Sequence, residues 1–262
     1  MIKKTIRVTL LSLKNKIKSV DTIIVILFLL SYFSFIFPSS CHNVMDAKES
    51  VNIATPFIHG YLLRDFQIIT LLGLVMMLGA RNTVDSNKVN VLMRVEKTEW
   101  YVSEILTMIV TCILYTGVIF ILSMLFYFPV LTIANGWGTG VESYRFFNNV
   151  LKAVEEMLQR NVFGVFFQAF VLILLVEIML GAICLLCDTL GKKRMGPIIC
   201  GGLIVWNLIA RAAEWIPGVF SPIGMLTGYA SGTFGYNALY LLVLNMILIN
   251  GIFFTGKKSD AI

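Results

Sequence analysis

The chain has 262 residues, of which 58% are hydrophobic and only 14% are charged, and its formal net charge at pH 7 is +6. Ordinary soluble domains carry about 25% charged residues, so this chain has too few charges to cover its apolar surface in water. The composition excludes a disordered chain, a nucleic-acid-binding module and a small secreted disulfide scaffold. We therefore expect an all-α, polytopic membrane protein with a single transmembrane domain over residues 1–262.

Residues 1–20 form a basic, amphipathic segment. Its apolar residues recur at steps of three and four and make one stripe of a helix: Ile2, Ile6, Leu10, Leu13, Ile17 and Val20. The lysines and Arg7 lie mostly off this stripe. The pattern predicts an N-terminal interfacial helix with its cations near anionic lipid on the cytoplasmic side, and a positively charged tail without fixed structure is the alternative.

Six apolar runs follow, and a membrane-spanning helix needs about 20 residues at a rise of 1.5 Å each. They cover residues 20–37, 66–80 (starting near Tyr61), 100–130, 162–187, 195–215 and 236–255. If both termini are cytoplasmic, 15 of the 21 lysines and arginines lie inside and 6 lie outside or at outer helix ends. This asymmetry predicts six transmembrane helices with the N- and C-termini in the cytoplasm.

Two outer connections are unusual. Residues 131–161 form a long loop that carries a second amphipathic helix over about 144–158. Residues 217–235 contain no charge and five glycines. Such a stretch is either a re-entrant turn whose backbone is covered by protein or a plain surface loop, and the sequence leaves both alternatives open.

The inner segment 81–99 is longer than a tight connection between two helices requires. Asp85 or Ser86 can cap a short helix in which Val89, Leu92 and Met93 share one face. The other face carries charged residues, namely Lys88, Arg94, Glu96 and Lys97. A short charged helix beneath a membrane bundle is suited to docking a soluble partner.

This layout resembles the permeases of ABC-2-type transporters over the whole chain. The inner segment resembles theirs in an acidic residue, small polar residues, an apolar helix, a basic residue and aromatic residues that open the third span: Asp85, Ser86-Asn87, Val89–Leu92, Arg94 and Trp100-Tyr101. A Ser-Pro near the end of the fifth span also recurs, here Ser221-Pro222. Glu104 departs from the pattern, because many relatives carry lysine there.

The resemblance implies the membrane subunit of an ABC transporter in a bacterial plasma membrane. A separate ABC ATPase subunit, which binds ATP and Mg, would dock on the coupling residues Asp85, Lys88, Arg94, Glu96 and Lys97. A second permease chain, identical or different, would complete a dimer around the substrate path. The cargo would be a peptide, an antibiotic or an amphiphile, and the short outer loops favour export.

The chain itself is not expected to be an enzyme or to bind a cofactor or metal. The run Gly251–Lys258 imitates a phosphate-binding loop, but Lys258 stands where magnesium binding requires Ser or Thr. No nucleophile–base pair or metal-binding motif occurs within a span, so we expect no catalytic residues. Energy must then come from a partner or from a gradient.

Polar residues inside the spans are candidates for the substrate path. Glu177 lies near the middle of the fourth span, and Glu104, Thr107 and Thr111 make a polar stripe on the third. The cysteines within the spans are expected to act as small apolar residues, with Cys41 in an outer loop. Two alternatives remain open: a membrane immunity or scaffold protein that binds a peptide, and a gradient-driven carrier.

Overall fold

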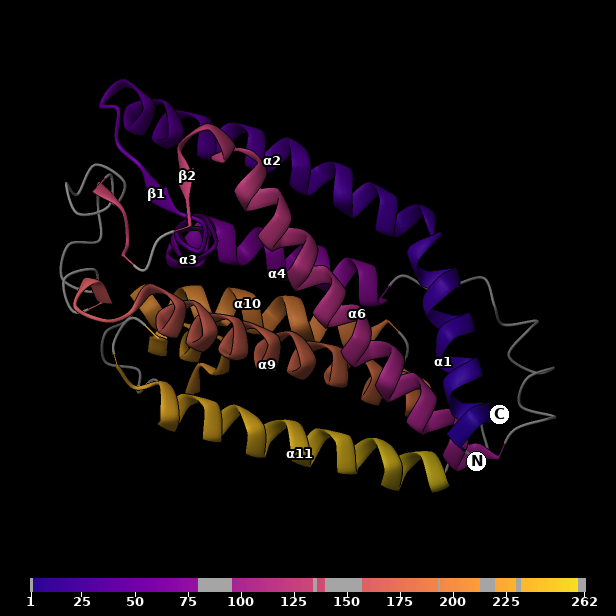
Figure 1. Cartoon of the computed structure of the whole chain (residues 1–262). Helices are drawn as coiled ribbons and strands as arrows, with labels where there is room; N and C mark the ends of the chain where they lie inside the picture. The colour runs from indigo at the N-terminus through magenta and orange to yellow at the C-terminus, as the bar shows by residue number, and fades with distance from the viewer. Residues whose placement is uncertain are drawn as a thin grey trace.

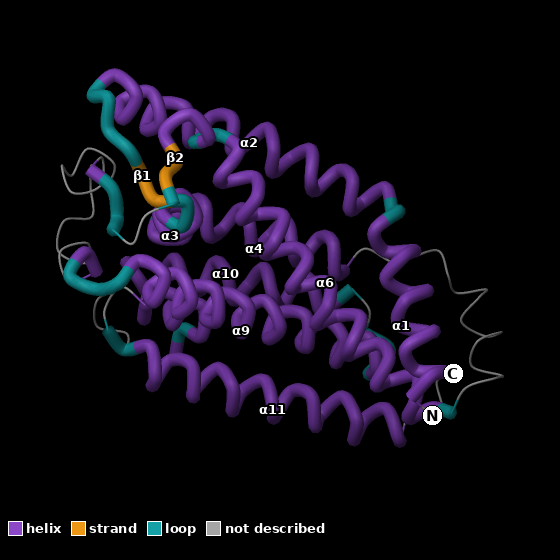
Figure 2. Tube along the Cα trace, viewed as in Figure 1, coloured by secondary structure: helices purple, strands orange, loops and turns teal. Residues whose placement is uncertain are grey.

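The computed structural model describes residues 2–79, 96–133, 136–139, 157–192, 194–212, 220–229 and 232–258. Within these ranges the fold is all-α apart from one pair of short parallel strands. The elements in chain order are α1 (Ile2–Ile17), α2 (Val20–Asp46), β1 (Val51–Asn52), α3 (Thr55–Leu62), α4 (Arg64–Gly79), α6 (Lys97–Leu125), η1 (Phe128–Val130), β2 (Leu131–Thr132), α9 (Val162–Thr189), α10 (Met195–Ala212), η3 (Pro222–Tyr229) and α11 (Phe234–Lys258). Figures 1 and 2 show a bundle with α1 and the end of α11 at one end and the two strands at the other.

In the part of the chain that the structure describes, four helices are long and apolar enough to cross a membrane, namely α2, α6, α9 and α11. The helices α3 and α4 together form a fifth candidate, which is bent by 93° at Leu63. The helix α10 is apolar but shorter. The transmembrane character is therefore confirmed by length and composition, whereas the six crossings and the orientation of the termini stay predictions.

The first span differs from its predicted bounds. The helix α2 continues through Pro38 to Asp46, well beyond the predicted end at Phe37. Cys41 consequently lies inside this helix and is buried, so the expectation that it belongs to an outer loop was wrong. The apolar run ends near Pro38, but a helix need not end where its hydrophobicity does.

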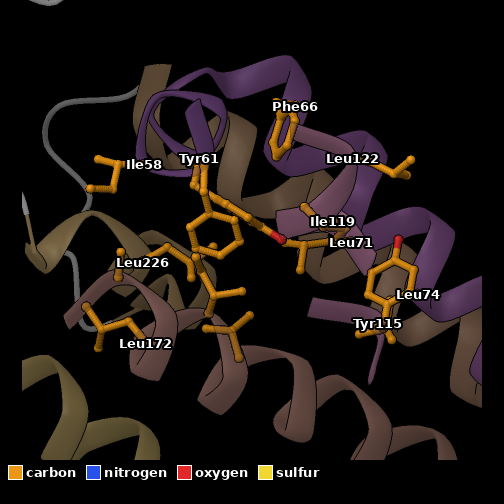
Figure 3. Packing of buried hydrophobic residues seen from close by; sticks show 14 of the residues in the cluster. Ile58, Tyr61, Phe66, Leu71, Leu74, Tyr115, Ile119, Leu122, Leu172 and Leu226 are labelled. Atoms are coloured by element: carbon orange, nitrogen blue, oxygen red, sulfur yellow. The ribbon is translucent and has the colours of Figure 1, made fainter. Parts of the chain in front are cut away.

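The helix α9 is the centre of the bundle and contacts α3, α4, α6, α10, α11 and η3. Asn161 caps its start, because the side-chain oxygen accepts hydrogen bonds from the backbone N–H of Phe163 (2.9 Å) and Gly164 (3.2 Å). The helix has apolar residues on all sides, which is typical of a helix surrounded by protein or lipid. In Figure 3, Leu172 of α9 lies in the same core as Tyr61 and Leu226.

Aromatic side chains hold the bend between α3 and α4. Phe66 stacks on Phe33 of α2, with ring centroids 4.9 Å apart, and meets Tyr61 edge to face at 5.1 Å. Its ring also lies against Gly60, where an added Cβ would come within 2.8 Å. The side-chain amide of Gln67 donates to the carbonyl of Tyr61 across the bend. The bend is thus filled by one aromatic ring and bridged by one buried hydrogen bond.

The uncharged connection between α10 and α11 is packed against the bundle where it is described. The 3₁₀ helix η3 contacts α9, α10 and α11, and Ile223 and Leu226 are buried. Ser221 donates to Asn207 of α10 at 2.8 Å, which ties the start of η3 to the preceding helix. This arrangement favours the re-entrant alternative over a free surface loop.

Small residues allow α10 to approach α9 closely. A Cβ at Gly196 would lie 2.8 Å from the Cα of Cys184, and this neighbour is backbone that a rotamer change cannot move away. By contrast, Gly202 of the same helix is exposed and has nothing within 4 Å of its Cβ position. The two glycines therefore have opposite roles, although both lie within α10.

We predict that Gly196→Ala lowers the free energy of unfolding by about 1–3 kcal/mol, because the methyl group forces the helices apart. The control Gly202→Ala should raise it by up to about 1 kcal/mol, because alanine favours a helix and meets no neighbour. Thermal unfolding in detergent, followed by circular dichroism, measures both changes. Equal effects of the two substitutions would contradict the close packing at Gly196.

Candidate functional site

The predicted coupling residues divide into two groups. Asp85, Lys88 and Arg94 lie outside the described residues. Glu96 and Lys97 are described, and both are exposed at the start of α6. The backbone of Glu96 begins the helix by accepting a hydrogen bond from the N–H of Trp100 at 3.0 Å. These two charged side chains are therefore attached directly to a long helix of the bundle.

The first turn of α6 is anchored by buried aromatic residues. Trp100 and Tyr101 are both 8% exposed and pack in a cluster with Ala182 of α9 and Ile252 of α11. Gly256 of α11 lies against the ring of Tyr101, where an added Cβ would be only 2.6 Å away. A force applied at Glu96 or Lys97 would consequently reach α9 and α11 through tightly packed groups.

The helix α1 packs on α6 through hydroxyl groups. Thr5 and Thr9 are buried, and the Thr9 hydroxyl lies 3.2 Å from the Ser103 hydroxyl of α6. The predicted apolar stripe faces outward, with Ile6 50% and Leu10 60% exposed. A helix that points its apolar side away from the protein is suited to contact with lipid, as the sequence predicts.

Lys16 lies at the end of α1, where the negative charges of Glu104 in α6 and Asp188 in α9 interact with its ammonium group. Burial lowers the pKa of Lys16, and the negative charge of Glu104 is the largest effect that opposes this shift. Glu104 is thus placed beside a cation of α1. Glu104 therefore differs in its charge environment from Thr107 and Thr111, which form one polar stripe with it in the sequence.

Thr107 and Thr111 are buried, but their hydroxyl groups bond to their own helix. Thr107 donates to the carbonyl of Ser103 (2.8 Å), and Thr111 donates to that of Thr107 (2.6 Å). Such bonds to the carbonyl four residues earlier let a polar side chain sit in an apolar environment. The donor capacity of both hydroxyls is used within α6, which weakens the expectation that they bind a substrate.

Glu177 is the most distinctive polar side chain in the core. It is fully buried in α9, and its Oε2 accepts a hydrogen bond of 2.6 Å from the hydroxyl of Thr116 in α6. Its Oε1 has no hydrogen-bond partner among the described residues. A buried carboxyl group with one free oxygen is costly unless a proton or a cation joins it. Glu177 can therefore accept a proton or hold a positively charged group.

Thr116 is the site residue that the sequence does not reveal. It lies on α6 like Thr107 and Thr111, and its hydroxyl is within 3.0 Å of the carbonyl of Cys112. Its distinguishing feature is the facing Glu177, 61 residues later. No local pattern identifies that pairing, although a hydroxyl residue near mid-span is a weak signal.

A second polar contact lies beside this pair. The Tyr115 hydroxyl donates to the carbonyl of Thr70 in α4 at 2.5 Å. Gly73 makes room for it, because a Cβ there would lie 2.7 Å from the tyrosine oxygen. The middle of α6 is consequently hydrogen-bonded to α4 on one side and to α9 on the other.

Within the part of the chain that the structure describes, no three His, Cys, Asp or Glu side chains form a group that could hold a metal ion. Comparison of the chain with protein-family models, curated proteins and solved structures finds no match. The candidate site therefore consists of the buried Glu177–Thr116 pair and the exposed start of α6.

We predict that Thr116→Val lowers the free energy of unfolding by about 1–3 kcal/mol, because it removes the donor to a buried carboxyl group. The control Thr111→Val should cost less than about 1 kcal/mol, because only a bond within its own helix is lost. Thermal unfolding in detergent checks both values. In a double-mutant cycle, Glu177→Leu should remove most of the penalty of Thr116→Val, and independent effects would contradict the contact.

Proposed function

We propose that this chain is the permease subunit of an ABC-2-type transporter, driven by a separate ABC ATPase subunit. The observation that carries the proposal is the course of α6. This helix runs without a break from the exposed Lys97 to Leu125, and it bonds to Glu177 at Thr116. From Lys97 to Thr116 it rises about 28 Å, at 1.5 Å per residue.

The geometry supports a mechanical route from a docked partner to the membrane interior. A motor bound at segment 81–99 would act on the start of α6, where Trp100 and Tyr101 are packed against α9 and α11. Any shift of α6 relative to α9 would change the contact between Thr116 and Glu177. ATP need only be bound differently in two conformations to bias such a shift.

In this proposal two permease chains pair around the substrate path in a bacterial plasma membrane, with both termini cytoplasmic. The cargo is exported, and it is a peptide, an antibiotic or another amphiphile. Glu177 would then recognise a positively charged group of the cargo, because its Oε1 can accept a hydrogen bond from that group. The outward apolar stripe and the cations of α1 would hold the inner end of the bundle at the lipid headgroups.

One observation favours a second candidate, the gradient-driven carrier. A fully buried acid in the middle of a spanning helix is a common element of proton-coupled transport. In that case Glu177 would load and release a proton, and no ATPase would be required. A membrane immunity or scaffold protein would require neither the acid nor a docking segment.

We predict that charge reversal of the docking segment by Arg94→Glu with Lys97→Glu weakens binding of the ATPase subunit about tenfold or more. The partner surface would complement the native cations, so it would repel the carboxylates that replace them. The experiment co-expresses the chain with candidate ABC ATPase subunits from its own genome, co-purifies the pair that assembles and measures ATP hydrolysis stimulated by the chain. Lys192→Glu is the control, because Lys192 is an exposed lysine in the turn after α9. Full assembly and full stimulation by the double variant would contradict the docking site.

We predict that Glu177→Gln reduces ATP-dependent export of a cationic amphiphile, such as a rhodamine dye, by about tenfold in proteoliposomes, because the amide cannot neutralise a cation. Thr116→Ser serves as the control, since it keeps the hydroxyl donor. ATP hydrolysis and assembly should survive both substitutions. Unchanged export by Glu177→Gln would assign the acid to packing.

A further inference from the structure

Two free cysteines of adjacent helices meet in the core. The Sγ atoms of Cys184 in α9 and Cys200 in α10 are 3.7 Å apart, and both side chains are reduced. Cys200 is completely buried and Cys184 is 8% exposed. The Sγ of Cys200 also lies 3.4 Å from the carbonyl of Leu180, one turn before Cys184 on α9. The two thiols are therefore enclosed by the two helices that carry them.

The helices α9 and α10 approach each other closely beside this pair. A disulfide requires Cα atoms about 4.4–6.8 Å apart and sulfurs about 2.05 Å apart. Gly196 and Cys200 are small residues spaced by four, and such spacing brings two membrane helices close together. One turn before Cys200, a Cβ added at Gly196 would lie only 2.8 Å from the Cα of Cys184. The two helices therefore approach closely at this point. Side-chain rotations and a small helix shift can therefore bring the two sulfurs into bonding distance.

The position of the pair indicates which oxidants reach it. Cys184 lies five residues before the end of α9, or about 8 Å along the helix axis. The outer face of α10 next to Cys200 is apolar, with Ile198 65% and Ile199 41% exposed. A hydrophobic oxidant dissolved in lipid would meet this apolar face, whereas a large hydrophilic disulfide stays in the water phase.

We propose that Cys184 and Cys200 form a redox-active dithiol that lipid hydroperoxides convert into a disulfide joining α9 to α10. This modification site does not depend on the proposed transport function. The disulfide fixes α10 on the central helix of the bundle. Reduction by a dithiol restores the free pair.

The reaction balances with one hydroperoxide for each disulfide. The Cys184 sulfur, as the more accessible of the two, attacks the terminal peroxide oxygen, the O–O bond breaks, and the lipid alcohol leaves with the thiol proton. The resulting sulfenic acid is then attacked by the Cys200 sulfur, the S–O bond breaks, and water leaves with the second thiol proton. The two thiols lose two electrons and two hydrogens, and the hydroperoxide is reduced to an alcohol and water.

The test treats the full chain in lipid nanodiscs with cumene hydroperoxide and then alkylates it with N-ethylmaleimide under denaturing conditions. The untreated chain has five cysteines to alkylate, and the oxidised chain should have three. Trypsin cuts after the exposed Lys192 and Arg194, so it separates the peptides of α9 and α10. A non-reducing digest should then contain these two peptides joined through Cys184 and Cys200.

Matched variants separate this pair from the other thiols. Cys187→Ser and Cys112→Ser should keep the cross-link, whereas Cys184→Ser and Cys200→Ser should each abolish it. Mapping of the unmutated chain decides the question even if one variant fails to fold. Five alkylated thiols after oxidation, or a link between Cys184 and Cys187, would overturn the proposal.

A second oxidant tests the lipid route. Oxidised glutathione at the same concentration should leave the pair reduced, with formation of the disulfide at least tenfold slower than with cumene hydroperoxide. Equal rates with the two oxidants would overturn the assignment of lipid hydroperoxides as the oxidant.

Discussion

The absence of water from the bilayer interior is the constraint on which the rest of this structure depends. Every polar group within the apolar spans must find its partner in the protein. Thr70, Thr107, Thr111 and Thr255 meet this demand locally, because each hydroxyl donates to the carbonyl four residues earlier. Asn245 meets it across helices, since its amide donates to the carbonyl of Leu175 in α9. Glu177 is the one side chain among these that can ionise, and one of its oxygens lacks a donor among the described residues.

The same constraint explains why glycine and other small residues sit where helices cross. Lipid chains are as apolar as leucine side chains, so helices in a bilayer associate through close packing and hydrogen bonds rather than through the hydrophobic effect. Gly73 admits the Tyr115 hydroxyl, Gly181 admits Met108, and Gly196 admits the backbone of α9. Each of these glycines lies at a contact with another element of the bundle. The central position of α9 thus follows from small residues at the helix contacts as much as from hydrophobicity.

Much of the helical architecture could be predicted from the sequence, because a run of about 20 apolar residues has few alternatives to a helix in lipid. The helices α6, α9 and α11 lie close to their predicted spans. The bend at Leu63 was not predicted, because it depends on Phe66 filling the space beside Gly60, which is a contact between side chains rather than a local propensity. The end of α2 was misplaced for a related reason, since hydropathy falls at Pro38 while the helix continues to Asp46.

The candidate site could be predicted only in part, and the division follows the range of the interactions. A lone acid within an apolar run is visible in the sequence, and Glu177 was identified in this way. Its partner Thr116 and the pairing of Cys184 with Cys200 were not, because both arise from the relative rotation of neighbouring helices. The apolar stripe of α1 is visible in the sequence, whereas the threonine side that packs on Ser103 is not. A periodic pattern states which residues share a face, whereas the neighbour that each face meets is decided by the whole bundle.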